Sequence, residues 1–366
     1  MKLVCQECDR TYPHDEPVWR CECGGMLDVE YTSQFPVETI KNRGRTQWRY
    51  REAIPVLYEE NIVSFNEGYT PMVKERISRK DVRLKLEYLF PSGSYKDRGA
   101  TVMISKAKEQ GVQRLVEDSS GNAGSAVAAY CAKAGIKCDI YVPSYASQGK
   151  LTQIRLYGAN LHEVPGTRED TADAAMKAAE NTFYGSHVWN PYFLQGTKTF
   201  AFETVEQLNW DIPDAIIMPL GHGGLLLGTF IGLEELFNAG IIDDFPRIIG
   251  VQSEACAPLA EAFQKGLDDY AEIEKQDTIA EGVTISNPLR APQILDAVRR
   301  TDGEIITVTE KEIRDALKET LKMGFYIEPT SATALAAIKD YAYGTTIVPL
   351  TGHGLKATNT LGKIFP

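Results

Sequence analysis

The ten residues PSGSYKDRGA (91–100) place one lysine, Lys96, among small hydroxyl side chains, an aspartate, an arginine and a glycine. A lysine that attacks carbonyl compounds must be reachable and ready to lose its proton. Lys96 is a candidate for this role, whereas the alternative is a solvated lysine at the start of a helix. The stretch therefore predicts a reactive amine, and the surrounding pattern predicts the fold that carries it.

Candidate strands and helices alternate along most of the chain. The strands are expected at 82–88, 114–118, 137–142, 215–218, 247–251 and 345–350, and the helices at 100–110, 122–134, 171–181, 225–239, 311–322 and 331–341. Such alternation predicts α/β layers with open, mostly parallel sheets. Parallel sheets place the loops that carry chemistry at the carboxyl ends of their strands.

The overall composition is that of a folded enzyme-sized chain. Its 366 residues are too many for one core of ordinary size, so two domains are expected. A net charge of −11 argues against nucleic acid as the main partner. The first residues, MKLVCQECDR, lack the apolar core of a targeting peptide, which favours a cytoplasmic location.

One apolar segment, residues 215–233, is nearly long enough to span a bilayer and contains no Asp, Glu, Lys or Arg. Pro219, His222 and four glycines between residues 221 and 228 interrupt it. Those residues would expose unsatisfied backbone groups to lipid, whereas a buried strand, a tight loop and a helix satisfy them. We therefore expect no membrane association.

Four of the seven cysteines lie in the first 23 residues, in the pattern C-x2-C-x12-C-x-C: Cys5, Cys8, Cys21 and Cys23. Two such pairs suit tetrahedral Zn²⁺ and resemble a zinc ribbon. The alternative is four reduced or disulfide-bonded thiols, and His14 could replace one ligand. The other three cysteines are scattered and are expected to be small buried apolar residues: Cys131, Cys138 and Cys256.

Three glycine-containing loops each follow a candidate strand: SSGNAG (119–124), GHGGLLLG (221–228) and TGHGLK (351–356). Glycine lets backbone N–H groups approach an anion, and a following helix adds partial positive charge, so GHGG is a candidate phosphate cradle. The loops match neither a P-loop nor a dinucleotide fingerprint. A lysine, an asparagine loop and a phosphate cradle together suit pyridoxal phosphate, an aldehyde cofactor that carries a phosphate.

PSGSYKDRGA also resembles the lysine motif of fold-type II pyridoxal-phosphate enzymes, and SSGNAG resembles their asparagine loop. The threonine synthase family is the best match, because the chain also has the cysteine ribbon, NPYFLQGTKTFAFETVEQL (190–208) and TGHGLK. The resemblance implies a zinc-ribbon-like segment at 1–30, an N-terminal α/β domain at 31–195 and a C-terminal α/β domain at 196–366. It also implies a homodimer.

The resemblance further implies a role for each site residue. Lys96 would hold the cofactor covalently and act as the base, and Asn122 would bond its phenolic oxygen. Thr351 would face the pyridine nitrogen, where a neutral hydroxyl does not require a protonated ring. The phosphate would be wrapped mainly by the backbone of Gly221, His222, Gly223, Gly224 and Leu225. Asparagines are frequent in family members where this chain has His222 and Leu225.

Substrate contacts are also implied by the resemblance. Ser119 and Ser120 would bind the substrate carboxylate. Ser94 and Arg98 would either meet a substrate phosphate or orient the lysine loop, and Arg98 could equally form a surface or domain-contact ion pair. His222 and His353 are expected to be structural loop histidines rather than acid–base catalysts.

The activity implied is a lyase reaction of threonine biosynthesis, the conversion of O-phospho-L-homoserine and water to L-threonine and phosphate. Related pyridoxal-phosphate chemistry is the first alternative: β-replacement, as in cysteate synthase, or threonine or serine ammonia-lyase activity. A zinc-ribbon binding module whose α/β body has lost catalysis is the second. The exact substrate, zinc occupancy, oligomeric state and effectors are left open by the sequence.

Overall fold

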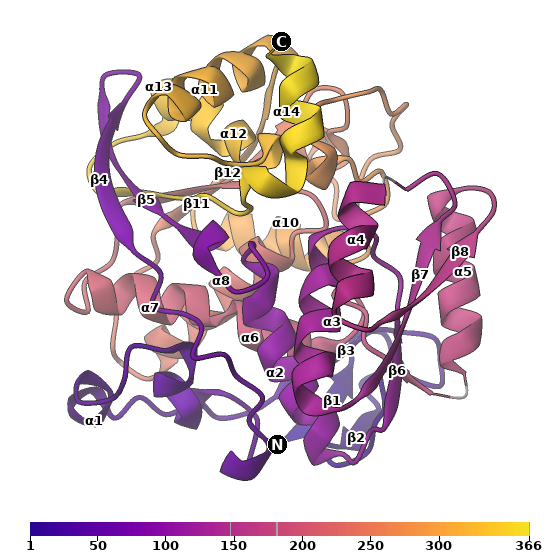
Figure 1. Cartoon of the computed structure of the whole chain (residues 1–366). Helices are drawn as coiled ribbons and strands as arrows, with labels where there is room; N and C mark the ends of the chain where they lie inside the picture. Colours follow the sequence, from indigo (N-terminus) through magenta and orange to yellow (C-terminus); the bar gives the residue numbers. More distant parts are fainter. Residues whose placement is uncertain (147, 181, 366) are drawn as a thin grey trace. The chain divides into compact units, whose positions relative to one another are not determined.

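The computed structural model describes residues 1–146, 148–180 and 182–365 (Figure 1). Its helices and strands alternate along the chain as expected. The final residue of the predicted helix 171–181 lies outside the described residues. Within the described ranges, no helix has the length and apolar content needed to cross a membrane.

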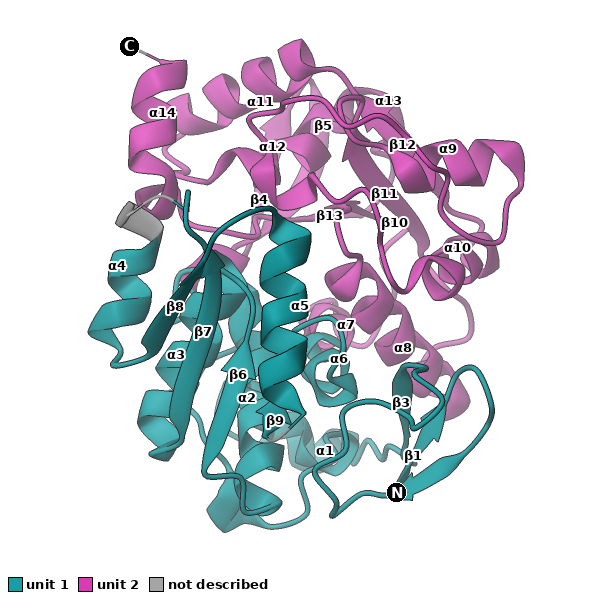
Figure 2. Ribbon diagram, turned by 90° about the vertical axis from the view of Figure 1, so that its right-hand side faces the viewer, with its two compact units in different colours: residues 1–69, 90–199 teal, residues 70–89, 200–366 magenta. Residues whose placement is uncertain are grey.

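The chain divides into two compact units, residues 1–69 with 90–199 and residues 70–89 with 200–366 (Figure 2). These units do not coincide with the ranges 31–195 and 196–366. The physical reason is strand pairing, because β4 (Met72–Ile77) and β5 (Lys80–Lys85) extend the sheet of the second unit. A segment from the first quarter of the chain therefore belongs to the C-terminal core.

The first unit begins with a small antiparallel sheet in the order β2-β1-β3. Its strands are β1 (Lys2–Cys5), β2 (Thr11–Pro13) and β3 (Leu27–Glu30). Cys5 ends β1, Cys8 lies between β1 and β2, and Cys21 and Cys23 lie between β2 and β3, an arrangement that fits a ribbon-like segment. The short helices α1 (Val37–Lys41), η1 (Gln47–Ala53) and η2 (Glu59–Asn61) follow it.

The main sheet of the first unit is parallel, in the order β8-β7-β6-β9. Its strands are β6 (Arg114–Glu117), β7 (Lys137–Pro143), β8 (Asn160–Val164) and β9 (Phe183–Tyr184). The helices around it are α2 (Lys96–Glu109), α3 (Asn122–Ala134), α4 (Gln148–Leu156), α5 (Arg168–Ala179) and α6 (Pro191–Thr197). Helices α3 and α5 cover opposite faces of the sheet in Figure 1 and Figure 2.

The second unit contains a six-stranded sheet in the order β12-β11-β10-β13-β5-β4, in which β4 alone runs antiparallel to its neighbour. Its remaining strands are β10 (Ala215–Pro219), β11 (Arg247–Ser253), β12 (Glu304–Val308) and β13 (Thr346–Pro349). These strands are rich in buried Ile and Val, as strands covered on both faces require.

Helices cover both faces of the second sheet. Helices α11 and α12 pack on one face, and α8 and α10 lie on the other (Figure 1). The helices of this unit are η3 (Glu87–Leu89), α7 (Thr199–Gln207), α8 (Gly224–Asn238), α9 (Pro258–Lys265), η4 (Glu281–Val283), α10 (Ala291–Arg300), α11 (Glu310–Lys322), α12 (Pro329–Ala336), α13 (Ile338–Tyr341), η5 (Gly354–Ala357) and α14 (Thr358–Ile364). The apolar segment 215–233 forms β10, a glycine loop and the first part of α8, as expected.

Candidate active site

Lys96 is the first residue of α2 and is half-buried. Its Nζ lies 5.0 Å from the ring centre of Tyr95 and 5.8 Å from that of Phe193 on α6. A Cβ at Gly99 would overlap the Phe193 ring, and a Cβ at Gly196 would overlap the carbonyl of Arg98. The two glycines therefore allow α2 and α6 to approach closely, which brings the aromatic ring beside the amine.

The loop before Lys96 is pinned by the buried side chain of Asp97. Its carboxylate accepts the Ser92 N–H at 2.8 Å and also accepts the Ser92 hydroxyl. Ser94 between them is fully buried, and its Oγ has no hydrogen-bond partner among the described residues. A buried hydroxyl without a partner is costly, so Ser94 is suited to a ligand that supplies one.

Arg98 is also fully buried. Its guanidinium lies over the Phe90 ring at 4.9 Å and donates to the Thr199 hydroxyl at 3.2 Å, while its carbonyl accepts from Gln47. These contacts tie Arg98 to the interior of the first unit. They fit the loop-orienting interpretation of Arg98, which stays a prediction.

The asparagine loop connects β6 to α3 and lies in the same unit as Lys96. Asn122 is the first residue of α3, and Gly121 takes the cap position without a side-chain cap bond. Ser119 and Ser120 are half-buried, and the Gly121 N–H donates to the Ser119 Oγ at 3.3 Å. The backbone N–H of Ser119 is already used, because it donates to the carboxylate of Glu117.

Sequence reasoning missed a buried pair behind this loop. Glu117 Oε1 lies 3.0 Å from His187 Nδ1, and burial raises the pKa of Glu117 to about 7. Burial also lowers the pKa of His187 well below its ordinary value. The available signal was the acidic pair Glu117–Asp118 at the end of an apolar strand, where charges are rarely buried without a purpose.

The predicted phosphate loop lies in the second unit, between β10 and α8. Gly223 has a φ of 75°, a left-handed conformation that favours glycine, and it caps α8. Gly224 begins the helix, and a Cβ built there would have nothing within 4 Å. The loop thus offers open space at a helix N-terminus, where backbone N–H groups favour an anion. Gly221, His222 and Leu225 flank this point.

Thr351 follows β13 in the same unit and is buried. Its Oγ1 lies 3.1 Å from the hydroxyl of Ser331 on α12, and its N–H donates to that hydroxyl at 2.9 Å. Ser331 was not singled out from the sequence. His353 accepts the Leu355 N–H through Nδ1 at 3.1 Å, a contact that fits the structural role expected for it.

The cysteine cluster stands apart from Lys96 in sequence but belongs to the same unit. The four sulfur atoms of Cys5, Cys8, Cys21 and Cys23 lie within 4.8 Å of one another and are all free thiols. The closest pairs are 3.5 Å and 3.6 Å apart, near the roughly 3.8 Å expected around tetrahedral zinc. His14 is not part of the cluster, since its Nδ1 lies 3.4 Å from Lys106 Nζ.

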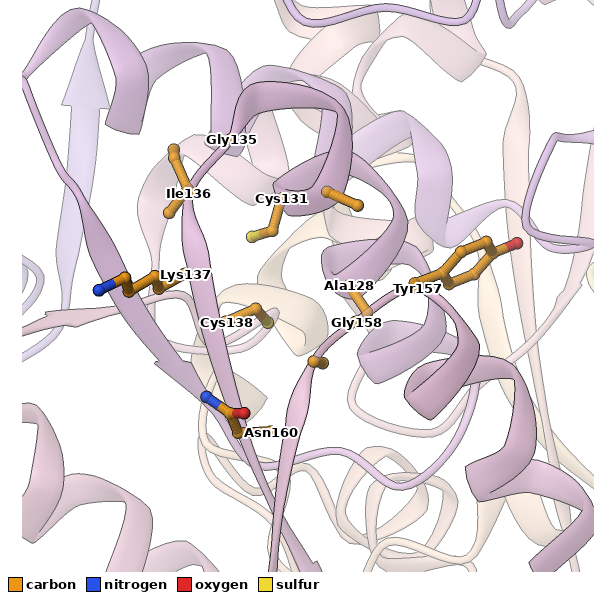
Figure 3. A pocket seen from close by; sticks show the side chains of 11 residues that line it. Ala128, Cys131, Gly135, Ile136, Lys137, Cys138, Tyr157, Gly158 and Asn160 are labelled. Atoms are coloured by element: carbon orange, nitrogen blue, oxygen red, sulfur yellow. The ribbon is translucent and has the colours of Figure 1, made fainter.

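A separate cavity of about 220 Å³ lies between α3, β7 and the segment before β8 (Figure 3). Cys131 and Cys138 contribute to its wall, and burial raises the pKa of the Cys131 thiol well above its ordinary value. These cysteines and Cys256 are buried, as expected. Among the described residues that line this cavity, none is a predicted site residue.

Comparison with known proteins decides the family. The model of the family described as "Pyridoxal-phosphate dependent enzyme" matches residues 63–352. This range includes Lys96, the loops 119–124 and 221–228, and Thr351. The chain belongs to this family. This pyridoxal-phosphate-dependent enzyme therefore uses the cofactor that the sequence indicated.

Curated relatives of the enzyme cover almost its whole length. Threonine synthase from Methanocaldococcus jannaschii is 37% identical, over 96% of this chain and 92% of that protein. Threonine synthase from Methanosarcina acetivorans is 33% identical, over 98% of this chain and 93% of that protein. These matches support the family resemblance seen in the motifs.

Solved structures show the same fold. Serine racemase from Dictyostelium discoideum has a TM-score of 0.66 and 29% identity, covering 78% of this chain and 92% of that one. The processed form of threonine deaminase isoform 2 from Solanum lycopersicum has a TM-score of 0.71 and 20% identity. The match covers 93% of this chain and 96% of that one. The fold-type II α/β architecture expected from the sequence is therefore confirmed.

Proposed function

We propose that this enzyme is a threonine synthase, which converts O-phospho-L-homoserine and water to L-threonine and phosphate. The observation that carries the proposal is the match to two threonine synthases over nearly the whole of this chain and of both relatives. The likeness to racemases and deaminases supports the fold and the cofactor rather than their reactions.

The residues present fit pyridoxal phosphate. Lys96 offers an amine at a helix start, Gly224 leaves room for an anion at the start of α8, and Thr351 presents a buried neutral hydroxyl. We assign covalent attachment to Lys96, the phenolic oxygen to Asn122 and the pyridine nitrogen to Thr351. The bound cofactor supplies an electron sink for negative charge that develops on the substrate.

The phosphate of the cofactor is assigned to the loop of the second unit. Backbone N–H groups at a helix start and a left-handed glycine form an anion-binding concavity without any basic side chain. Replacing family asparagines by His222 and Leu225 leaves this backbone arrangement intact. The residues assigned to it are Gly221, His222, Gly223, Gly224 and Leu225.

The chain's own groups also account for substrate orientation and proton transfer. Ser119 and Ser120 bind the substrate carboxylate. Ser94 donates to an anionic oxygen from its buried hydroxyl, for which the described part of the chain supplies no hydrogen-bond partner. Arg98 orients the loop that precedes Lys96. Once freed by the substrate, the amine of Lys96 accepts the Cα proton as a general base beside the aromatic rings of Tyr95 and Phe193.

The test offers O-phospho-L-homoserine to the purified holoenzyme and follows inorganic phosphate and threonine together. Equal amounts of both products are expected. Phosphate without threonine would indicate a lyase outcome, and neither product would overturn the proposal. Sulfite with O-phosphoserine, and ammonia release from threonine or serine, then test the β-replacement and ammonia-lyase alternatives.

We also propose that the cluster of Cys5, Cys8, Cys21 and Cys23 binds structural Zn²⁺ and that the enzyme is a cytoplasmic homodimer. Sulfur spacing supports the metal, and free thiols are consistent with a reducing compartment. Light scattering of the purified enzyme tests the dimer, because a mass of one chain would contradict it.

A further inference from the structure

One buried carboxylate connects the asparagine loop to a buried imidazole. Glu117 is fully buried at the end of β6, and one of its oxygens accepts the backbone N–H of Ser119. The other oxygen lies 3.0 Å from Nδ1 of His187, which is 9% exposed. Neither group has a role in the chemistry proposed so far, although Glu117 is hydrogen-bonded to Ser119, which is assigned to the substrate carboxylate.

These hydrogen bonds survive a change in the number of protons on Glu117. An ionised Glu117 accepts a bond from Nδ1–H of His187, and a Glu117 protonated on Oε1 donates to an unprotonated Nδ1. A neutral imidazole can do either, because one ring nitrogen donates and the other accepts. In both states the remaining carboxyl oxygen continues to accept the Ser119 N–H. The loop geometry is therefore independent of the charge on Glu117.

The surroundings make Glu117 the group whose charge changes near neutrality. Neighbouring Asp118 is already paired, since Arg168 donates to it at 2.8 Å and Tyr184 donates at 2.9 Å. Burial raises the pKa of Glu117 to about 7, against the attraction of Arg168 and Lys96. The titratable groups that face Glu117 are His187, Lys96, Arg168, Asp118, Tyr184 and Cys131.

We propose that Glu117 and His187 are positioning residues for the substrate carboxylate, which keep the Ser119 backbone in place while Glu117 exchanges a proton with solvent as the nearby charge changes. A buried anion would repel an incoming carboxylate, and protonation removes that repulsion without moving the loop. The inference rests on the proposed function, because Ser119 and Ser120 are assigned to the carboxylate there.

The experiment compares three variants of the holoenzyme. Glu117→Gln keeps both hydrogen bonds but cannot ionise, and Glu117→Ala loses both. Glu67→Gln is the matched control, because Glu67 is a buried carboxylate of the same unit that also accepts a loop N–H, from Phe65. Each protein is tested with O-phospho-L-homoserine and with 3-aminopropyl phosphate, which has the same amine and phosphate but no carboxylate.

We expect Glu117→Ala to raise KM for phosphohomoserine at least about tenfold while the inhibition constant of 3-aminopropyl phosphate changes less than about twofold. The Glu67→Gln control should change neither. An equal increase in the KM for phosphohomoserine and in the inhibition constant of 3-aminopropyl phosphate would overturn the proposal. If phosphohomoserine is not converted at all, the same comparison is made by binding L-serine and ethanolamine, so failure of the proposed function is recognised separately.

A second readout does not depend on turnover or on the folding of the alanine variant. Nitrogen-15 spectra of the histidines should show His187 changing tautomer between about pH 5.5 and about pH 8.5 in the wild type. In Glu117→Gln, the amide N–H must donate to Nδ1, so His187 should keep its proton on Nε2 throughout. A wild-type tautomer that stays constant over this range would overturn the proposal.

Discussion

The hydroxyl of Ser331 accepts the backbone N–H of Thr351 at 2.9 Å and lies 3.1 Å from the Thr351 hydroxyl. Both residues are buried, and they join the start of α12 to the end of β13. Ser331 thereby fixes the direction of the hydroxyl that we assign to the pyridine nitrogen. It is the supporting residue of that contact.

The change Ser331→Ala should weaken cofactor binding several-fold and destabilise the protein by about 1–3 kcal/mol, because it leaves the buried Thr351 N–H without an acceptor. Absorbance titration with pyridoxal phosphate and denaturant unfolding measure the two effects. Thr333→Ala on the same helix is the control. Equal cofactor affinity in the two variants would refute the supporting role of Ser331.

Lys96→Ala should abolish both the absorption band of the covalently bound cofactor and turnover. The change removes the amine at the start of α2 to which we assign the covalent bond. Borohydride treatment of the wild type should place the label on the peptide that contains Lys96. Lys108→Ala, on the exposed end of the same helix, should retain both properties. Labelling of a different lysine would contradict the assignment.

Gly196→Ala should destabilise the first unit by about 1–3 kcal/mol and lower activity, since the new methyl group meets the carbonyl of Arg98. Gly362→Ala serves as the comparison, because a Cβ there has open space within α14. The change in melting temperature relative to the wild type should differ in sign or size between the two variants. Equal changes would exclude close packing of α2 against α6.

Glu117→Gln should change how stability depends on pH. Burial raises the pKa of Glu117 from an ordinary 4.5 to about 7, so the folded state binds the proton more tightly and loses stability as pH rises from 4.5 to about 7. Relative to the wild type, the variant should gain about 3 kcal/mol over that window. His187, whose pKa is lowered, gives the opposite slope below its ordinary 6.5 in both proteins. Unfolding curves with parallel pH dependence would count against the raised pKa.

Removal of metal should destabilise the first unit. If free zinc is a hundredfold above its dissociation constant, a chelator should lower the free energy of unfolding by about 2.7 kcal/mol. Mass spectrometry should find about one zinc ion per chain, and almost none after Cys8→Ser with Cys23→Ser. Cys256→Ser, at a buried thiol of the other unit, should keep its zinc. A metal-free wild type whose melting is insensitive to chelator would refute the site.

Much of the candidate site could be predicted because its chemistry is local in sequence. Lys96, Asn122 and Thr351 each follow or begin a regular element, and glycine spacing marks the loops that must approach an anion. Short apolar runs likewise predicted strands such as β6 and β10. These features depend on short-range sterics and on the periodicity of helices and strands.

The supporting residues could not be predicted, because they depend on pairing between distant segments. Glu117 meets His187 only because β6 pairs with β9, with Val116 opposite Tyr184. Ser331 meets Thr351 across an α12–β13 contact that no spacing in the sequence indicates. In the same way, β5 joins the second unit by pairing with β13.

The sequence by itself therefore determined the α/β class, the candidate lysine, the glycine-containing loops and the four-cysteine motif, since residue type and local spacing constrain the backbone directly. Only the tertiary structure decided which unit holds β4 and β5, where Ser94 and Arg98 are buried, and which carboxylate supports the asparagine loop. Strand order and burial arise from long-range packing, and many local sequences are compatible with each such arrangement.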